Sequence, residues 1–176
     1  MRLQDARRDH YRKLAHEQGF RSRAAYKLKE LNQSYRLIGP GFYVLDLGCA
    51  PGGWTQMAVK LAGNQGKVMG VDLSYVEEIP GANIIRADIE DEFLVDEILD
   101  YFGRKVNAVI CDLAPHVSGN WTIDHAKQIS LNYECAKIMD KVLMHKGNAV
   151  FKVFDCLLYT SPSPRDVEES RMPSSA

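Results

Sequence analysis

The sequence predicts a Rossmann-like α/β domain, in which helices cover both faces of a mostly parallel sheet. Short runs rich in Val and Ile alternate along the chain with stretches of helical character. These runs are almost continuously apolar, which is typical of parallel strands that are buried on both faces. Because strands and helices alternate, we expect right-handed crossovers between parallel strands. The expected strands are 42–49, 67–73, 82–88, 106–114 and 147–154.

Helices are expected before the first strand and between the later ones. They cover about 22–35, 53–62, 90–102 and 124–145. Ser22 is the expected N-terminal cap of the first helix. In the third, the apolar residues Phe93, Leu94, Ile98 and Phe102 recur at helical spacing, which predicts one buried face.

The composition is that of an ordinary globular protein. The chain has 176 residues, 45% apolar and 26% charged, which suits one domain with a real hydrophobic core. No apolar run approaches the ~20 residues of a membrane span, and the charged N-terminus is unlike a secretory signal. The cysteines are scattered without a CxxC pair, which argues against a disulfide framework or a zinc site. We therefore expect a cytoplasmic protein with no membrane association.

Positive charge is concentrated at the beginning of the chain. Residues 1–40 carry ten basic and four acidic side chains, whereas the net charge of the whole chain is −1. Such a segment is either a polyanion-binding face or a solvated helix surface, and charge alone does not separate the two. We assign residues 1–40 to a basic helical segment of the same domain and residues 41–155 to its core.

The segment 156–176 breaks the pattern. It is rich in Ser and Pro and shows neither helical nor strand periodicity. A β-α-β domain is not expected to stop at its fifth strand with that edge uncovered. The segment is therefore either a natural disordered tail or a foreign sequence that replaces the original C-terminus. We favour the second interpretation, because TSPSPRD resembles a translated cloning adaptor.

A glycine-rich turn, DLGCAPGGW, runs from Asp46 to Trp54 at the end of the first strand. Glycines at this place let the backbone approach a ligand closely and lead into the next helix. The spacing is not that of the dinucleotide fingerprint GxGxxG, and Pro51 interrupts it. The turn therefore does not predict a pyrophosphate site.

Acidic residues end the next two strands. Asp72 can accept hydrogen bonds from both hydroxyls of a ribose, and Asp88 is placed to meet an adenine amino group. Each acid alone could equally be a cap or turn residue. With Asp46 they form a series of acids at successive strand ends, facing the ligand crevice of an open α/β sheet. An adenosyl ligand without pyrophosphate fits this pattern best, which points to S-adenosylmethionine.

Lys152 lies within the apolar strand GNAVFKVF, and the fourth strand ends in Asp112. Because desolvating an ammonium is costly, Lys152 either extends to solvent at the strand end or pairs with Asp112. In the second case, burial and a nearby second cation favour the neutral amine, which can accept a hydroxyl proton. Lys27 is a candidate for that cation, although it could equally be a surface lysine paired with Glu30.

Four motifs, in this order and spacing, resemble the FtsJ/RrmJ family of RNA ribose 2′-O-methyltransferases. They are SRAAYKL (22–28), DLGCAPGGW (46–54), CDLAP (111–115) followed by Ser118 and Gly119, and FKVF (151–154). The likeness extends from about residue 10 to 155. It implies the S-adenosylmethionine-dependent methyltransferase fold, here without its last strands.

The resemblance also implies the site residues. Those expected to bind S-adenosylmethionine are Gly52, Trp54, Asp72, Asp88 and Asp112. The family's catalytic tetrad is Lys-Asp-Lys-Glu, and its first three members correspond to Lys27, Asp112 and Lys152. Lys152 would be the proton acceptor. Arg21, Arg23 and their basic neighbours would contact the RNA backbone.

Two departures from the family pattern stand out. His116 occupies a position where the family commonly has Asn, and we interpret it as a loop residue near the RNA. A metal cluster of His116, Asp124 and His125 is disfavoured, and no metal is expected. The fourth tetrad member belongs on a late strand, beyond the start of the Ser/Pro-rich segment. We do not transfer that role to Glu168 or Glu169.

The expected activity is S-adenosylmethionine-dependent methylation of a ribose 2′-hydroxyl in RNA, with a uridine of large-subunit ribosomal RNA as the favoured target. A transfer RNA substrate is the first alternative. The second is a truncated, inactive module that binds RNA or S-adenosylmethionine without turnover. A nicotinamide-dependent oxidoreductase is disfavoured, because GxGxxG is absent and Lys152 lies in an apolar strand. A monomer is the expected oligomeric state.

Overall fold

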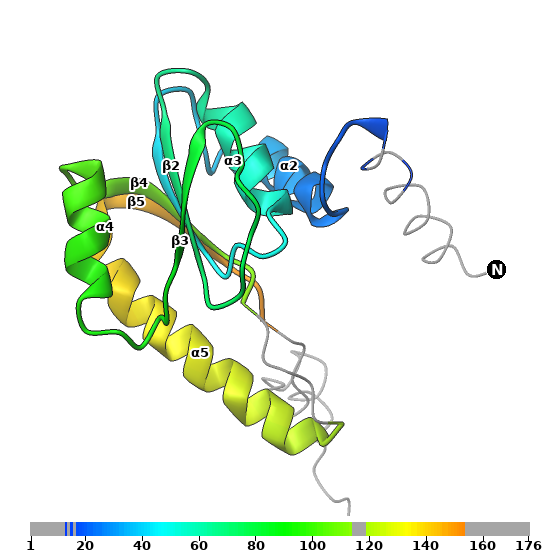
Figure 1. The fold of residues 1–176 in the computed structure, drawn as a ribbon, viewed down its shortest axis with the longest axis vertical. Coiled ribbons are helices and arrows are strands. Elements are labelled where there is room, and N and C mark those ends of the chain that lie inside the picture. Colours follow the sequence, from blue (N-terminus) through cyan, green and yellow to red (C-terminus); the bar gives the residue numbers. More distant parts are fainter. Residues whose placement is uncertain (1–12, 14, 16, 114–118, 154–176) are drawn as a thin grey trace, which may run out of the picture.

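The fold is a parallel five-stranded sheet in the order β3-β2-β1-β4-β5 (Figure 1). It is seen in a computed structural model that describes residues 13, 15, 17–113 and 119–153. The prediction of a parallel, Rossmann-like sheet is confirmed. The strands are β1 (Tyr43–Leu47), β2 (Lys67–Asp72), β3 (Ala82–Arg86), β4 (Val106–Cys111) and β5 (Leu143–Phe151).

Helices cover both faces of the sheet (Figure 1). The helices α2 (Ala24–Tyr35) and α3 (Gly53–Ala62) pack on one face, where Val44 of β1 belongs to their hydrophobic core. The helices α4 (Leu94–Phe102) and α5 (Trp121–Val142) pack on the other, against Leu45 of β1. Adjacent residues of the central strand therefore serve opposite cores, which explains its continuously apolar sequence.

Helix starts and strand ends differ from the sequence prediction in several places. Ser22 does not cap α2, because the helix begins one residue later, with Arg23 at the N-cap position and no side-chain cap bond. Phe93 is 68% exposed because it precedes the first turn of α4 and lies outside the helical periodicity. The strand β4 ends at Cys111, which leaves Asp112 just beyond the sheet. The strand β5 begins at Leu143, earlier than expected, and includes a register shift against β4.

All five strands run in the same direction, so their carboxyl ends lie along one edge of the sheet. Of the residues that the sequence analysis selected, Asp72, Asp88 and Asp112 lie along that edge. Within the part of the chain that the structure describes, no helix is both long and apolar enough to cross a bilayer. The predicted segment 156–176 lies outside the described residues.

Candidate cofactor and catalytic site

A cavity of about 530 Å³ opens at the carboxyl edge of the sheet, above β1, β2, β3 and β4. The loops that follow these strands supply most of its lining, and α5 closes one side. Three of the acids selected from the sequence line it: Asp72, Asp88 and Asp112. The sequence prediction thus placed these three carboxylates correctly along a common crevice. The lining from α5, Lys127, Ser130 and Leu131, was not predicted.

The glycine-rich turn forms the floor of the cavity through Gly48 and Ala50. Gly48 has φ +78°, and a Cβ there would overlap the side chain of Leu113, the second residue after β4. The backbone N–H groups of Gly48 and Cys49 both donate to the carbonyl oxygen of Val71, at 2.8 and 3.1 Å. The turn is thus pressed between the ends of β2 and β4, where a side chain larger than hydrogen does not fit.

Asp72 holds the loop that follows β1 and the loop that follows β2. Its Oδ2 accepts a hydrogen bond from the backbone N–H of Ala50 at 2.9 Å, and its Oδ1 accepts one from Ser74 at 2.8 Å. Asp88 accepts one such bond, from the N–H of Glu90 at 3.0 Å. Both acids are therefore turn residues and cavity residues together. The interpretation of these acids as turn residues and their interpretation as residues facing the crevice are therefore compatible.

Gly52 and Trp54, at the end of the turn, are not among the residues that line the cavity. Trp54 is 3% exposed, and its indole Nε1 donates to the carbonyl oxygen of Ala24 in α2 at 2.8 Å. Gly52 has φ +112° and is packed against Arg21 and Ile79. The structure gives both residues a packing role, and their contact with a cofactor stays a prediction.

Asp46 differs from the acids at the rim of the cavity, because its side chain is fully buried in β1 beneath the floor. Its Oδ2 accepts a hydrogen bond from the hydroxyl of Thr55 at 2.6 Å, whereas Oδ1 has no hydrogen-bond partner. Burial raises the pKa of Asp46 to about 7, and the charges of Asp112 and Asp72 add to this increase. The expectation that Asp46 faces the crevice is therefore wrong.

The ion pair expected between the last two strands is present. Lys152 Nζ lies 2.6 Å from Asp112 Oδ1. The two residues follow β5 and β4 directly, and the N–H of Lys152 donates to the carbonyl oxygen of Cys111 at 2.8 Å. Because Asp112 also lines the cavity, the pair lies at its border. Of the two interpretations of Lys152, the structure favours pairing over simple extension into solvent.

Lys27 is exposed on α2. The alternative interpretation, an ion pair between Lys27 and Glu30, is not observed, because no salt bridge joins these two described residues. The structure also shows no contact between Lys27 and the pair of Asp112 and Lys152. Its catalytic role therefore stays a prediction.

Gln128 is a functional candidate that the sequence analysis missed. This residue of α5 is 2% exposed, and its Nε2 donates to the carbonyl oxygen of Leu113 at 2.9 Å and to Asn132 Oδ1 at 3.3 Å. It thus attaches α5 to the segment that follows Asp112. The only signal in the sequence was a polar residue on the buried side of a helix, which reveals no partner.

The residues of the disfavoured metal cluster divide between described and undescribed parts of the chain. His116 lies outside the described residues. Asp124 Oδ2 accepts a hydrogen bond from the N–H of Gly119 at 3.2 Å. No group of three or more potential metal ligands occurs within 17–113 and 119–153.

The residues present fit S-adenosylmethionine. Asp72 presents a carboxylate held by two backbone donors, and the cavity falls within the range of small-molecule sites. Asp88 borders the same space and can accept a bond from an adenine amino group.

Comparison with known proteins shows the family of the chain. The model of the FtsJ-like methyltransferase family matches residues 20–162. A protein of Nitrosopumilus maritimus, named ribosomal RNA large subunit methyltransferase E, is 85% identical over 155 residues, which are 88% of this chain and 79% of the relative. A protein of the same name from Cenarchaeum symbiosum is 64% identical over the same shares of both chains.

A solved structure from Plasmodium falciparum, described as a ribosomal RNA methyltransferase, has a TM-score of 0.72 and 26% identity. The likeness covers 78% of this chain and 80% of that one. The chain belongs to the FtsJ-like methyltransferase family. It is an S-adenosylmethionine-dependent methyltransferase, as the motifs predicted.

Proposed function

We propose that this methyltransferase acts on a ribose 2′-hydroxyl of large-subunit ribosomal RNA, with a uridine as the target nucleotide. The observation that carries the proposal is the ion pair of Lys152 and Asp112 at the border of the cofactor cavity. A hydroxyl must lose one proton on methylation, and this pair offers a basic group beside the cofactor site. The names of the relatives at 85% and 64% identity support ribosomal RNA as the acceptor.

S-adenosylmethionine, when bound, supplies a methyl group on a sulfonium, which is already a good leaving group. The remaining work of the protein is to position the hydroxyl and remove its proton. Lys152, once it has released its own proton to solvent and is a neutral amine, would accept that proton at Nζ. Asp112 holds Nζ at 2.6 Å and compensates the positive charge that Lys152 then carries.

The basic N-terminal segment would bind the RNA. Arg23 and Lys27 are exposed at the start of α2, where their charges can meet phosphates. Affinity that arises from such contacts falls as the salt concentration rises. We further propose that the protein acts as a monomer in the cytoplasm, within the context of the large ribosomal subunit.

The test compares Lys152→Ala with Lys105→Ala. Lys105 precedes β4 and is exposed at the opposite edge of the sheet, so it is a matched lysine outside the site. Calorimetry would measure S-adenosylmethionine binding, and transfer of a labelled methyl group to large-subunit ribosomal RNA and to transfer RNA would measure activity. We expect Lys152→Ala to lose about 100-fold or more of the transfer rate and to keep cofactor affinity. Lys105→Ala should behave like the wild type.

Three outcomes would contradict the proposal in different ways. A Lys152→Ala enzyme that keeps a substantial rate would remove Lys152 from the role of proton acceptor. Preferential methylation of transfer RNA would change the substrate. A wild-type chain that binds S-adenosylmethionine but methylates neither RNA would support the inactive binding module instead.

A further inference from the structure

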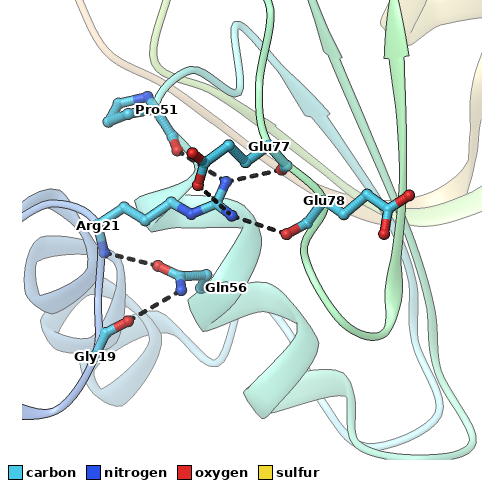
Figure 2. A network of polar contacts seen from close by, with 6 residues as sticks. All are labelled: Gly19, Arg21, Pro51, Gln56, Glu77 and Glu78. Atoms are coloured by element: carbon cyan, nitrogen blue, oxygen red, sulfur yellow. Dashed lines mark hydrogen bonds and ion pairs between the residues drawn. The ribbon is translucent and has the colours of Figure 1, made fainter.

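Arg21 lies where the basic N-terminal segment meets the methyltransferase core, and its side chain points into the protein (Figure 2). Its Nη1 donates to the carbonyl oxygen of Glu77 at 2.8 Å and to that of Pro51 at 3.4 Å. Its Nη2 donates to the carbonyl oxygen of Glu78 at 2.8 Å and lies 3.6 Å from Glu77 Oε2. The expectation that Arg21 contacts the RNA backbone is not supported by this arrangement.

These contacts occupy the part of the guanidinium that would bind a phosphate. Arginine binds phosphates through the fork of its terminal nitrogens, and here both nitrogens have protein partners. The side chain is only 23% exposed. A phosphate would have to displace backbone carbonyls that have no other donor in this network. The guanidinium of Arg21 therefore makes its contacts within the protein, whereas Arg23 is exposed.

The main chain at Arg21 is attached to the same region. The N–H of Arg21 donates to Gln56 Oε1 at 2.8 Å, and Gln56 Nε2 donates to the carbonyl oxygen of Gly19 at 3.1 Å. Gln56 lies in the first turn of α3, the helix that follows the glycine-rich turn (Figure 2). The backbone of Arg21 thus connects the N-terminal segment to the start of α3.

The carbonyls that Arg21 binds belong to the two loops that shape the cofactor cavity. Pro51 follows Ala50, whose N–H holds the carboxylate of Asp72. Glu77 and Glu78 lie farther along the loop that begins directly after Asp72. One guanidinium therefore joins the loop after β1 to the loop after β2.

The surroundings of Gly52 show how closely the glycine-rich turn packs against Arg21. A Cβ at Gly52 would lie 3.2 Å from both Cδ and Nη1 of Arg21, and 2.6 Å from Cδ1 of Ile79. The turn is thus packed directly on the arginine. A movement of either cofactor loop would therefore displace Arg21. The displacement would pass to α2, which begins at Ala24 and carries Lys27.

We propose that Arg21 is a positioning residue that couples the cofactor loops to the RNA-facing helix α2, so that S-adenosylmethionine and RNA strengthen each other's binding. This inference rests on the proposed function, because it requires RNA as the second ligand. Coupling of this kind is reciprocal: whatever factor RNA adds to cofactor affinity, the cofactor adds to RNA affinity.

The test measures the affinity of the wild type, Arg21→Ala and Arg23→Ala for S-adenosylhomocysteine, with and without large ribosomal subunits, whose RNA is the proposed acceptor. For the wild type we expect RNA to tighten binding by about 5-fold or more. In Arg21→Ala that factor should fall to about one, with weaker cofactor binding even without RNA. Arg23→Ala should weaken RNA binding and lower its salt dependence, but keep the coupling factor at saturating RNA.

Arg21→Lys separates coupling from charge and from folding. Lysine keeps the positive charge but cannot span the carbonyls of two loops with a planar fork. We expect it to lose most of the coupling while circular dichroism shows a folded protein. Wild-type coupling that persists in Arg21→Lys would overturn the inference, as would a wild type that methylates ribosomal RNA without any coupling. A wild type that does not bind or methylate this RNA would instead overturn the proposed function.

Discussion

The part of the carboxyl edge above β1–β3, the proposed cofactor half, differs from the part above β4 and β5, the proposed catalytic half, in how it is held together. In the cofactor half, Asp72 and Arg21 bind backbone groups of several loops. In the catalytic half, one ion pair of 2.6 Å joins Lys152 to Asp112. The cofactor site is thus reinforced by cross-links between its own loops, whereas the catalytic pair depends on how two strands are aligned.

The alignment of β5 on β4 has an irregular beginning. Val106 pairs with Leu143, but Ala108 already pairs with Asn148, so several extra residues of β5 are accommodated between these pairs. From there the register is regular up to Cys111 and Phe151, which places Asp112 and Lys152 side by side. Among the described strands, β5 pairs only with β4, and all nine of its residues are partly or fully exposed. The catalytic geometry therefore has less packing behind it than the cofactor site.

The largest effect is expected at Asp46, which lies beneath both halves. Its folded-state pKa of about 7 lies above the ordinary 3.8 because of burial, so the folded protein holds a proton that the unfolded chain releases. The resulting stabilisation is complete below the ordinary pKa and is lost as pH rises to about 7, a change of about 4 kcal/mol. Asp46→Asn should remove this decline, as urea unfolding between about pH 4 and about pH 8 would show.

Asp100→Asn is the control for that experiment, because Asp100 is exposed on α4. This variant should keep the pH dependence of the wild type. A wild-type free energy of unfolding that stays level or rises over this interval would show that Asp46 is not held neutral in the folded protein.

The next effect is expected at Gly48, where the two halves touch. Alanine there would adopt an unfavourable positive φ, at about 1–2 kcal/mol, and would overlap Leu113, at about 1–3 kcal/mol more. We expect Gly48→Ala to lower the free energy of unfolding by about 3 kcal/mol in urea titrations. Gly103→Ala isolates the backbone contribution, since its φ is +67° and a Cβ added there would meet no atom within 4 Å. Equal losses in the two variants would mean that the contact with Leu113 is unimportant.

The smallest effect compares two acids within the cofactor half. Asp72 holds two loop N–H groups, whereas Asp88 holds one. Asp72→Ala should therefore weaken S-adenosylmethionine binding by about 30-fold, as expected for losing hydrogen bonds to a charged group, and Asp88→Ala by about 5-fold. Calorimetric titration of both variants measures the difference. A greater loss in Asp88→Ala would show that the adenine contact outweighs the ordering of the loops.

The sequence was sufficient to predict the parallel sheet and the carboxylates around the cavity. The reason is that parallel strands bring their carboxyl ends to one edge, so Asp72, Asp88 and Asp112 meet once their strands are identified. The pairing of Lys152 with Asp112 was one of two outcomes that the sequence left open, because a lysine at an apolar strand either extends to solvent or finds a partner.

Other features were decided only by the tertiary structure. The direction of the Arg21 side chain, the burial of Asp46 and the packing of Trp54 against α2 depend on segments far away in the chain. The same holds for the contribution of α5 to the cavity. Local periodicity determines which residues form a strand or a helix, whereas the side of a turn that a residue faces is determined by what packs against it. The sequence by itself thus specified the edge of the sheet where the predicted cofactor-binding acids gather, and tertiary packing, such as that of α5, decided which side chains line the cavity there.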